Sequence, residues 1–210
     1  MKTFIRVKEL TRVFGRISES NFEAKVARLG PLYEDLRIEI VGIAEETIEP
    51  MDRFDARYRR NYFLRRSIAT LLEFAEAIRH VDECPEFDAV KRGFPPEIAR
   101  YWNRALAFFK RADDTLKSFR NDFGGHFGLE AARWAALHLD PDAVERIEIG
   151  KYFYLHFTGE FVATAMLRHG WGVNRDHKIR RLVRLAMLGY RHATRSVHCV
   201  VTCYLWDKFG

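Results

Sequence analysis

The residues best suited to chemistry are Arg120, Asn121 and His126, which form the run Arg-Asn-x4-His. A histidine can move a proton, and an arginine can neutralise charge that develops on a phosphate. An Arg/His pair held together could therefore cleave a phosphodiester without a metal ion. The asparagine could hydrogen-bond the backbone or a neighbouring side chain.

The elements around this run decide whether the pair can meet. In one unbroken helix, residues six apart lie about 120° from each other, so Arg120 and His126 would not converge. Gly124-Gly125 lies between them and favours a break that would let His126 begin the next helix. The same residues also fit an ordinary helix end, because arginine is favourable near a helix C-terminus. Spacing alone leaves both interpretations open.

Apolar periodicity predicts helices along most of the chain, separated by the prolines. The strongest pattern runs from Pro96 to Asn121 and has apolar residues at three-and-four spacing. The expected helices cover Asn21–Leu29, Leu32–Thr47, Asp52–Val81, Pro96–Asn121, Phe127–Leu139, Tyr152–Arg168 and His177–Trp206. Alternating Ile147 and Ile149 favour one short β segment near 144–150.

These patterns predict an all-α fold, a helical bundle with long amphipathic helices that begin near Asp52, Pro96 and His177. The length of 210 residues fits a single all-α domain over 1–210. Within it, residues 1–50 would form an N-terminal helical arm, 51–140 the core and 141–210 the C-terminal helices.

The composition indicates a folded protein with a moderately basic surface. The net charge of +6 suits an anionic partner such as RNA, although many proteins are this basic. Three cysteines form no disulfide framework and favour a reducing compartment. We see neither a secretory signal nor an apolar segment long enough for a membrane span. The sequence therefore predicts a cytoplasmic protein with no membrane association.

The run Phe119-Arg120-Asn121-Asp122-Phe123-Gly124-Gly125-His126 resembles the signature of the HEPN superfamily. Its ribonuclease members carry an arginine after a hydrophobic residue, then a polar residue, a short spacer and a histidine. The family domain is a compact bundle of helices with the motif near a junction of two late helices. The resemblance makes residues 51–140 a HEPN-like core and departs from the family at the two glycines.

The resemblance implies a metal-independent endoribonuclease that needs no cofactor. His126 would act as general acid or base, Arg120 would stabilise the charged phosphorane, and Asn121 would hold the geometry. Sites in this family are usually composite across two subunits, so a homodimer is implied. Members act in defence or toxin–antitoxin settings, or accompany a nucleotidyltransferase, and some only bind RNA.

Arginines interleaved with aromatic residues precede the motif by about sixty positions. Arg57, Arg60 and Arg65 are the candidate RNA-binding residues, since arginine grips phosphate and neighbouring aromatics stack bases. A solvated helix face, with the aromatic side chains turned to the core, is the favoured explanation of this pattern. The alternative function is a non-catalytic all-α interaction module, such as a partner of a nucleotidyltransferase or an antitoxin. A third interpretation gives the Arg/His pair a purely structural role.

Overall fold

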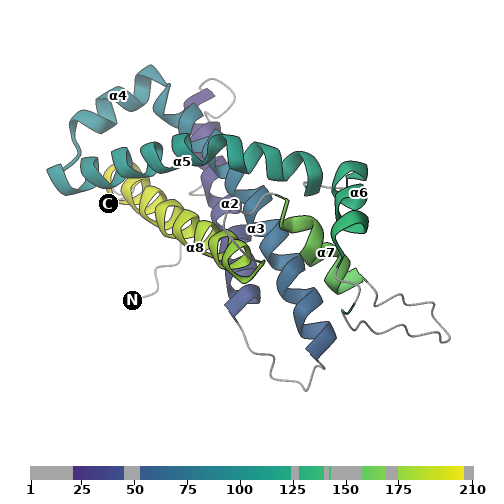
Figure 1. The fold of residues 1–210 in the computed structure, drawn as a ribbon. Helices are drawn as coiled ribbons and strands as arrows, with labels where there is room; N and C mark the ends of the chain where they lie inside the picture. Colours follow the sequence, from purple (N-terminus) through teal and green to yellow (C-terminus); the bar gives the residue numbers. More distant parts are fainter. Residues whose placement is uncertain are drawn as a thin grey trace. The chain divides into compact units, whose positions relative to one another are not determined.

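The structure is a computed structural model, and it describes residues 21–44, 53–123, 128–139, 142, 158–168 and 175–205. The described part of the chain is all-α, as predicted, and contains no β-strand. Figure 1 shows its helices, several of them long. The elements are α2 (Asn21–Ala44), α3 (Arg53–Asp82), α4 (Pro85–Arg92), α5 (Pro96–Phe123), α6 (Leu129–His138), α7 (Thr158–Met166), α8 (Arg175–Val200) and a π-helical turn, η1 (Val201–Leu205).

The chain divides into two compact units that interleave along the sequence. Unit 1 comprises Met1–Glu34, Glu73–Lys110 and Arg191–Gly210, and unit 2 comprises Asp35–Leu72 and Arg111–Tyr190. The unit boundaries fall inside α2, α3, α5 and α8.

Helix α5 confirms the helix predicted from the clearest periodicity. Pro96 starts it, because a proline at the first helical position gives up an N–H that has no partner inside the helix. One side of the helix is buried at three-and-four spacing throughout. The buried positions are Trp102, Ala105, Phe109, Ala112, Leu116, Phe119 and Phe123.

The predicted break between Leu29 and Leu32 is wrong, because α2 continues through Pro31 as one helix. Two features explain the continuity. Gly30 has no Cβ to clash with the proline ring that follows it. The same stripe of buried side chains also runs through both halves, so packing outweighs the cost of about 3 kcal/mol for a proline inside a helix. The stripe comprises Phe22, Val26, Leu29, Leu32, Leu36 and Ile40.

Helix α4 was not predicted from periodicity because it has only eight residues. Its ends nevertheless carry ordinary signals. Pro85 is at its start, acidic residues lie in its first turn and basic residues in its last, and the Gly93 N–H bonds the Val90 carbonyl at 3.0 Å. These signals, rather than hydrophobic spacing, could have located it.

Unit 1 contains a cluster of buried aromatic rings. Phe87 of α4 packs against Trp102 of α5 with ring centroids 4.7 Å apart, and against Phe22 of α2 at 6.0 Å. The Trp102 indole donates to the Asp82 carboxylate at 2.8 Å, and Lys91 donates to the same oxygen at 3.1 Å. Asp82 therefore links the end of α3 to α4 and α5.

In unit 2, two glycines allow close packing against α3. A Cβ at Gly42 of α2 would lie 2.5 Å from the Phe63 ring. A Cβ at Gly189 of α8 would lie 2.6 Å from the Leu71 side chain, which is fully buried. Helices α6 and α7 pack directly on each other.

Helices α3 and α8 lie close to the ranges predicted for them. Helix α3 confirms the predicted long helix to within one residue at each end. Helix α8 begins two residues before His177 and gives way at Val201 to the π-helical turn, earlier than the predicted end at Trp206. The predicted β segment at 144–150 lies outside the described residues. No described helix is both long and apolar enough to cross a membrane.

The three cysteines lie in unit 1, and their reactivity would test the burial that the structure gives them. Cys84 and Cys199 are buried free thiols, whereas Cys203 is half-buried. Burial raises the pKa of Cys199 from 9.0 to about 11, with a smaller contribution from Cys203. Iodoacetamide at pH 8 should therefore label one thiol in the native protein, at Cys203, because thiolates react and buried thiols do not.

Intact mass gives the number of labels, and Cys203→Ser should remove the single one. Two or three rapid labels on the native chain would contradict the buried positions. The raised pKa also has a consequence for stability. The contribution of the protonated Cys199 is complete below pH 9 and should be lost as the pH rises toward 11.

Candidate functional site

Arg120 and Asn121 lie in the last turn of α5, and both are exposed. Their position follows from the residues around them. Phe119 and Phe123 point into unit 2, with ring centroids 4.7 Å apart, and both are buried. This anchoring leaves the intervening arginine and asparagine on the solvent side of the helix.

The chain returns to this turn after α5 ends. Gly128 donates its backbone N–H to the Asp122 carbonyl at 2.7 Å. The Asp122 carboxylate also accepts from Arg168, which follows α7, at 3.1 Å. Residues at the start of α6 and at the end of α7 are thus tied to the turn that carries Arg120. His126, the third predicted catalytic residue, lies outside the described residues.

Gly128 makes this return possible. A Cβ at this position would lie 3.2 Å from the Asp122 carbonyl oxygen and 3.3 Å from its Cα, closer than most side chains approach backbone. The same glycine precedes α6 with an extended backbone. The tie between Asp122 and Arg168, 46 residues apart, has no signal in the sequence.

The three candidate RNA-binding arginines all lie in the first half of α3. Arg60 is exposed and Arg65 is half-buried, while the side chain of Arg57 lies outside the described residues. Arg65 follows Arg60 by five positions, which places them about 140° apart around the helix. The three arginines therefore do not share one face of α3.

Arg65 shares its face with two exposed tyrosines instead. Tyr58 and Tyr62 are 41% and 44% exposed, and they precede Arg65 by seven and three positions. Burial lowers the pKa of Arg65 below its usual value, an effect that the phenols of Tyr58 and Tyr62 partly offset. Its Nε atom is buried and has no hydrogen-bond partner among the described residues.

The adjoining face of α3 packs on α2. Arg59 lies over the Phe63 ring at 5.5 Å, and the Tyr62 ring meets the same ring edge-on at 5.3 Å. Arg66 lies 3.6 Å from Glu39 of α2, which also accepts from the Thr70 hydroxyl at 3.0 Å. The two contacts to Glu39 tie this face of α3 to α2 within unit 2.

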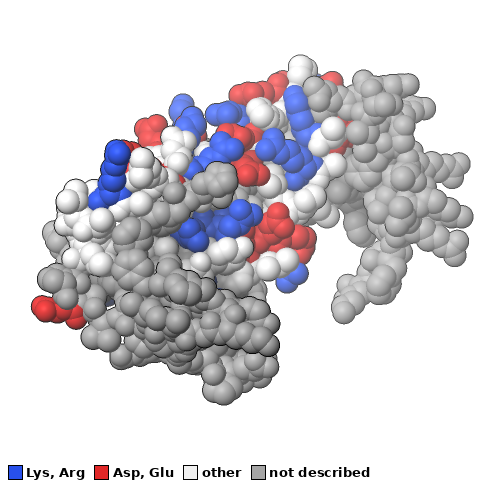
Figure 2. All heavy atoms as spheres, turned by 90° about the vertical axis from the view of Figure 1, so that its right-hand side faces the viewer, with Lys and Arg blue, Asp and Glu red and all other residues white. Residues whose placement is uncertain are grey.

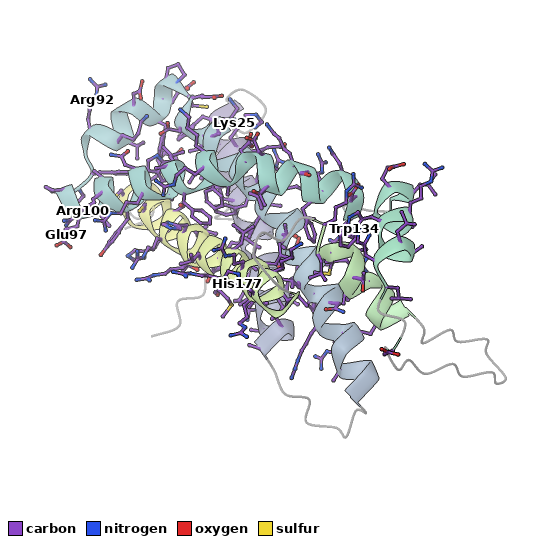
Figure 3. The ribbon with its side chains drawn as sticks, in the orientation of Figure 1. Lys25, Arg92, Glu97, Arg100, Trp134 and His177 are labelled. Carbon is purple, nitrogen blue, oxygen red and sulfur yellow. The ribbon has the colours of Figure 1, made fainter. Side chains whose placement is uncertain are left out.

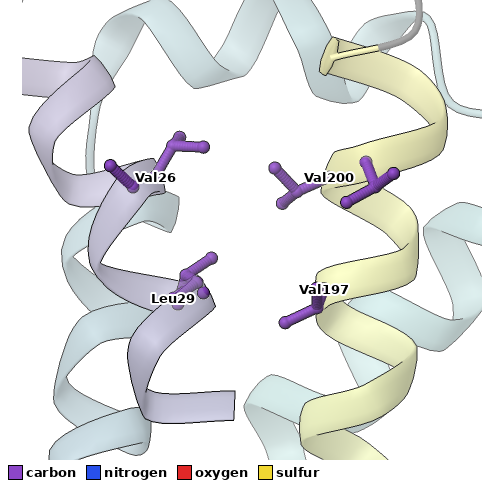
Figure 4. Close-up of a pocket in the computed structure, with 7 residues that line it drawn as sticks. Val26, Leu29, Val197 and Val200 are labelled. Carbon is purple, nitrogen blue, oxygen red and sulfur yellow. The ribbon is translucent and has the colours of Figure 1, made fainter. Parts of the chain in front are cut away.

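Unit 1 holds an apolar cavity of about 240 Å³ between the first half of α2 and the end of α8. Figure 4 shows valines of the two helices facing each other across it. The lining residues are Val26, Ala27, Leu29, Gly30, Val197, Val200 and Val201. None of these side chains can transfer a proton or bind a phosphate, so the cavity offers no catalytic group.

A second hollow in the described part of the chain is lined by charged side chains of α4. Arg92, which extends away from α4 in Figure 3, lies beside Lys91 and Asp88 around a shallow surface hollow. Lys91 is already paired with Asp82 and Asp88. Within the described ranges, no group of three or more His, Cys, Asp or Glu could hold a metal ion.

Basic and acidic side chains are interspersed on the face drawn in Figure 2. The start of α3 differs from this mixture. Residues 53–66 contain six arginines and one acidic residue, Asp55. Positive charge is thus concentrated locally in the sequence, although the face drawn in Figure 2 is mixed.

Comparisons with known proteins yield no relative. No protein-family model matches the chain, and neither a curated protein nor a solved structure matches it significantly.

Proposed function

We propose that the chain is a HEPN-like, metal-independent endoribonuclease that acts in the cytoplasm. Arg120, Asn121 and His126 carry the reaction, and the arginines of α3, among them Arg57, Arg60 and Arg65, contact the RNA. One observation in particular supports the proposal. The Asp122–Gly128 hydrogen bond brings the chain back to the turn where Arg120 and Asn121 are exposed.

The proposed reaction uses the ribose itself as nucleophile. The 2′-oxygen attacks the adjacent phosphorus, the bond to the 5′-oxygen breaks, and a 2′,3′-cyclic phosphate and a 5′-hydroxyl result. One base must take the 2′-proton and one acid must protonate the departing oxygen. In a homodimer, which the resemblance implies, His126 of each subunit could supply one of these roles. Arg120 stabilises the charge on the phosphorane.

The test is cleavage of a mixed RNA by purified protein in EDTA. Wild type should cut and leave 2′,3′-cyclic ends, whereas Arg120→Ala and His126→Ala should each cut at least about 100-fold more slowly. Lys117→Ala is a matched control, because Lys117 is an exposed cation on α5 that pairs with Asp113 one turn earlier. No cutting by wild type, or equal cutting by all variants, would contradict the proposal.

A second candidate function is a non-catalytic interaction module, and α6 favours it. Leu129 and Leu137 of this helix are 64% and 81% exposed, more than any other large apolar side chain in the described ranges. Exposed apolar residues on one element suggest a protein contact, for instance with an antitoxin or a nucleotidyltransferase. A Leu137→Ser variant that loses a co-purifying partner, with no RNA cleavage by wild type, would support this alternative.

A further inference from the structure

We propose that the face formed by Tyr58, Tyr62 and Arg65 on α3 binds unpaired bases, so that single-stranded RNA is the ligand. The inference rests on the proposed function in that both name RNA as the partner. It adds the class of RNA and the side chains that select it. Three observations carry it: the exposure of the tyrosines, their spacing and the charge around them.

The exposure of these rings is not explained by the fold. The buried face of α3 is made by other positions, among them Leu64, Ile68 and Leu71, which are 3% exposed or less. Tyr58 and Tyr62 leave more than two fifths of their surfaces in solvent. An exposed ring with a polar tip is well suited to stacking on a base, because every base presents a π-face.

The spacing places the rings in a row. Tyr58, Tyr62 and Arg65 fall within about 60° of the helix circumference, and the two tyrosines are separated by about 6 Å of rise. Successive unstacked bases of an extended strand can each meet one ring. A duplex keeps its bases paired and offers no free face to either ring.

Arg65 is placed to hold the phosphate beside a stacked base. Its Nε is buried, so packing rather than solvent fixes the side chain, and less conformational entropy is lost on binding. Arg59 is also held in place, over the Phe63 ring that touches Tyr62. The excess of arginine in residues 53–66 complements a polyanion and favours RNA over an uncharged protein surface.

The test is fluorescence anisotropy with a labelled 12-nucleotide RNA whose riboses are 2′-O-methylated. This probe lacks the 2′-hydroxyl and cannot be cut, so binding is measured independently of catalysis. Tyr58→Ala and Tyr62→Ala should each weaken binding about tenfold. Tyr58→Phe and Tyr62→Phe keep the rings and should bind as wild type does, whereas Tyr62→Leu should bind as weakly as Tyr62→Ala.

Further binding measurements separate the contribution of base stacking from that of phosphate contacts. Arg65→Gln should reduce the slope of log affinity against log salt by about 0.7, the value for one phosphate contact on a single strand. Arg79→Gln removes a charge from the far end of α3, where Arg79 pairs with Glu83, and should leave the slope unchanged. The same RNA annealed to its complement should bind more weakly than the single strand and be insensitive to the tyrosine variants.

The outcomes distinguish this inference from the proposed function. Ring-dependent binding without cleavage of ordinary RNA would support the stacking face and contradict the nuclease. Cleavage with binding that is unchanged in Tyr58→Ala and Tyr62→Ala would overturn the stacking face alone. Full affinity of Tyr62→Leu for the single strand would also overturn it, as would tyrosine variants that lose as much affinity for duplex RNA as for the single strand. Wild-type protein that binds anionic vesicles but not RNA would overturn it too.

Discussion

Replacing Asp82 with alanine should lower the free energy of unfolding by about 2 kcal/mol. This carboxylate accepts the indole N–H of Trp102, a side chain only 1% exposed, and Lys91 donates to the same oxygen. Without it the buried indole N–H has lost its acceptor, and a buried donor left unsatisfied is costly. Urea unfolding followed by tryptophan fluorescence gives the change.

The neighbouring residue provides a matched control. Glu83 is also acidic and lies one residue beyond the end of the same helix, but its side chain is 63% exposed and its contact with Arg79 is 3.9 Å long. Glu83→Ala should therefore change stability by less than about 0.5 kcal/mol. Equal losses in the two variants would show that Asp82 contributes only surface charge. Trp102→Phe, which lacks the N–H, should make a subsequent Asp82→Ala substitution much less costly.

Gly189→Ala should destabilise the protein even though alanine is the better helix former. A Cβ at this position would lie 2.6 Å from two carbon atoms of Leu71, which is fully buried on α3. Overpacking of this kind costs about 1–3 kcal/mol, which exceeds the gain of about 0.5–1 kcal/mol from replacing a helical glycine. We expect a net loss of about 1–2 kcal/mol in denaturant unfolding.

The effect of Gly189→Ala on stability should change sign when Leu71 is shortened. Leu71→Ala alone should cost about 2–5 kcal/mol by leaving a cavity, and Gly189→Ala added to it should be neutral or stabilising. Gly93→Ala is a second reference, since its Cβ would meet only the Val90 carbonyl oxygen, at an ordinary 3.4 Å. An identical loss from Gly189→Ala in both backgrounds would mean that the two side chains do not compete for the same space.

Much of the fold follows from the sequence because local and tertiary signals agree in the long helices. In α5 a proline at the first position and an unbroken apolar stripe lead to the same boundaries. In α2 they conflict, since Gly30-Pro31 indicates a stop while the stripe continues on both sides. The structure follows the stripe, because burial along a whole helix outweighs one missing hydrogen bond.

Less of the candidate site than of the fold can be predicted from the sequence. Periodicity places Arg120 and Asn121 on the solvent side of α5, since Phe119 and Phe123 must be buried. It also separates Arg60 from Arg65, so arginine content by itself does not define a binding face. The tie from Asp122 to Arg168 depends on how α6 and α7 fold back, which no short-range pattern encodes.

That tie bears on how genetic data for this chain should be interpreted. Asp122 lies two positions from Arg120, and its carboxylate is bound to Arg168. If the chain has the proposed activity, a selection for loss-of-function alleles would recover changes at Arg120 and at Asp122, for unrelated reasons. Under the proposed ribonuclease function, alleles of Arg120 should accumulate normally in the cell as inert protein. Alleles of Asp122 should reduce the steady-state amount of protein, and a temperature-sensitive phenotype would distinguish them from alleles that remove a reacting group.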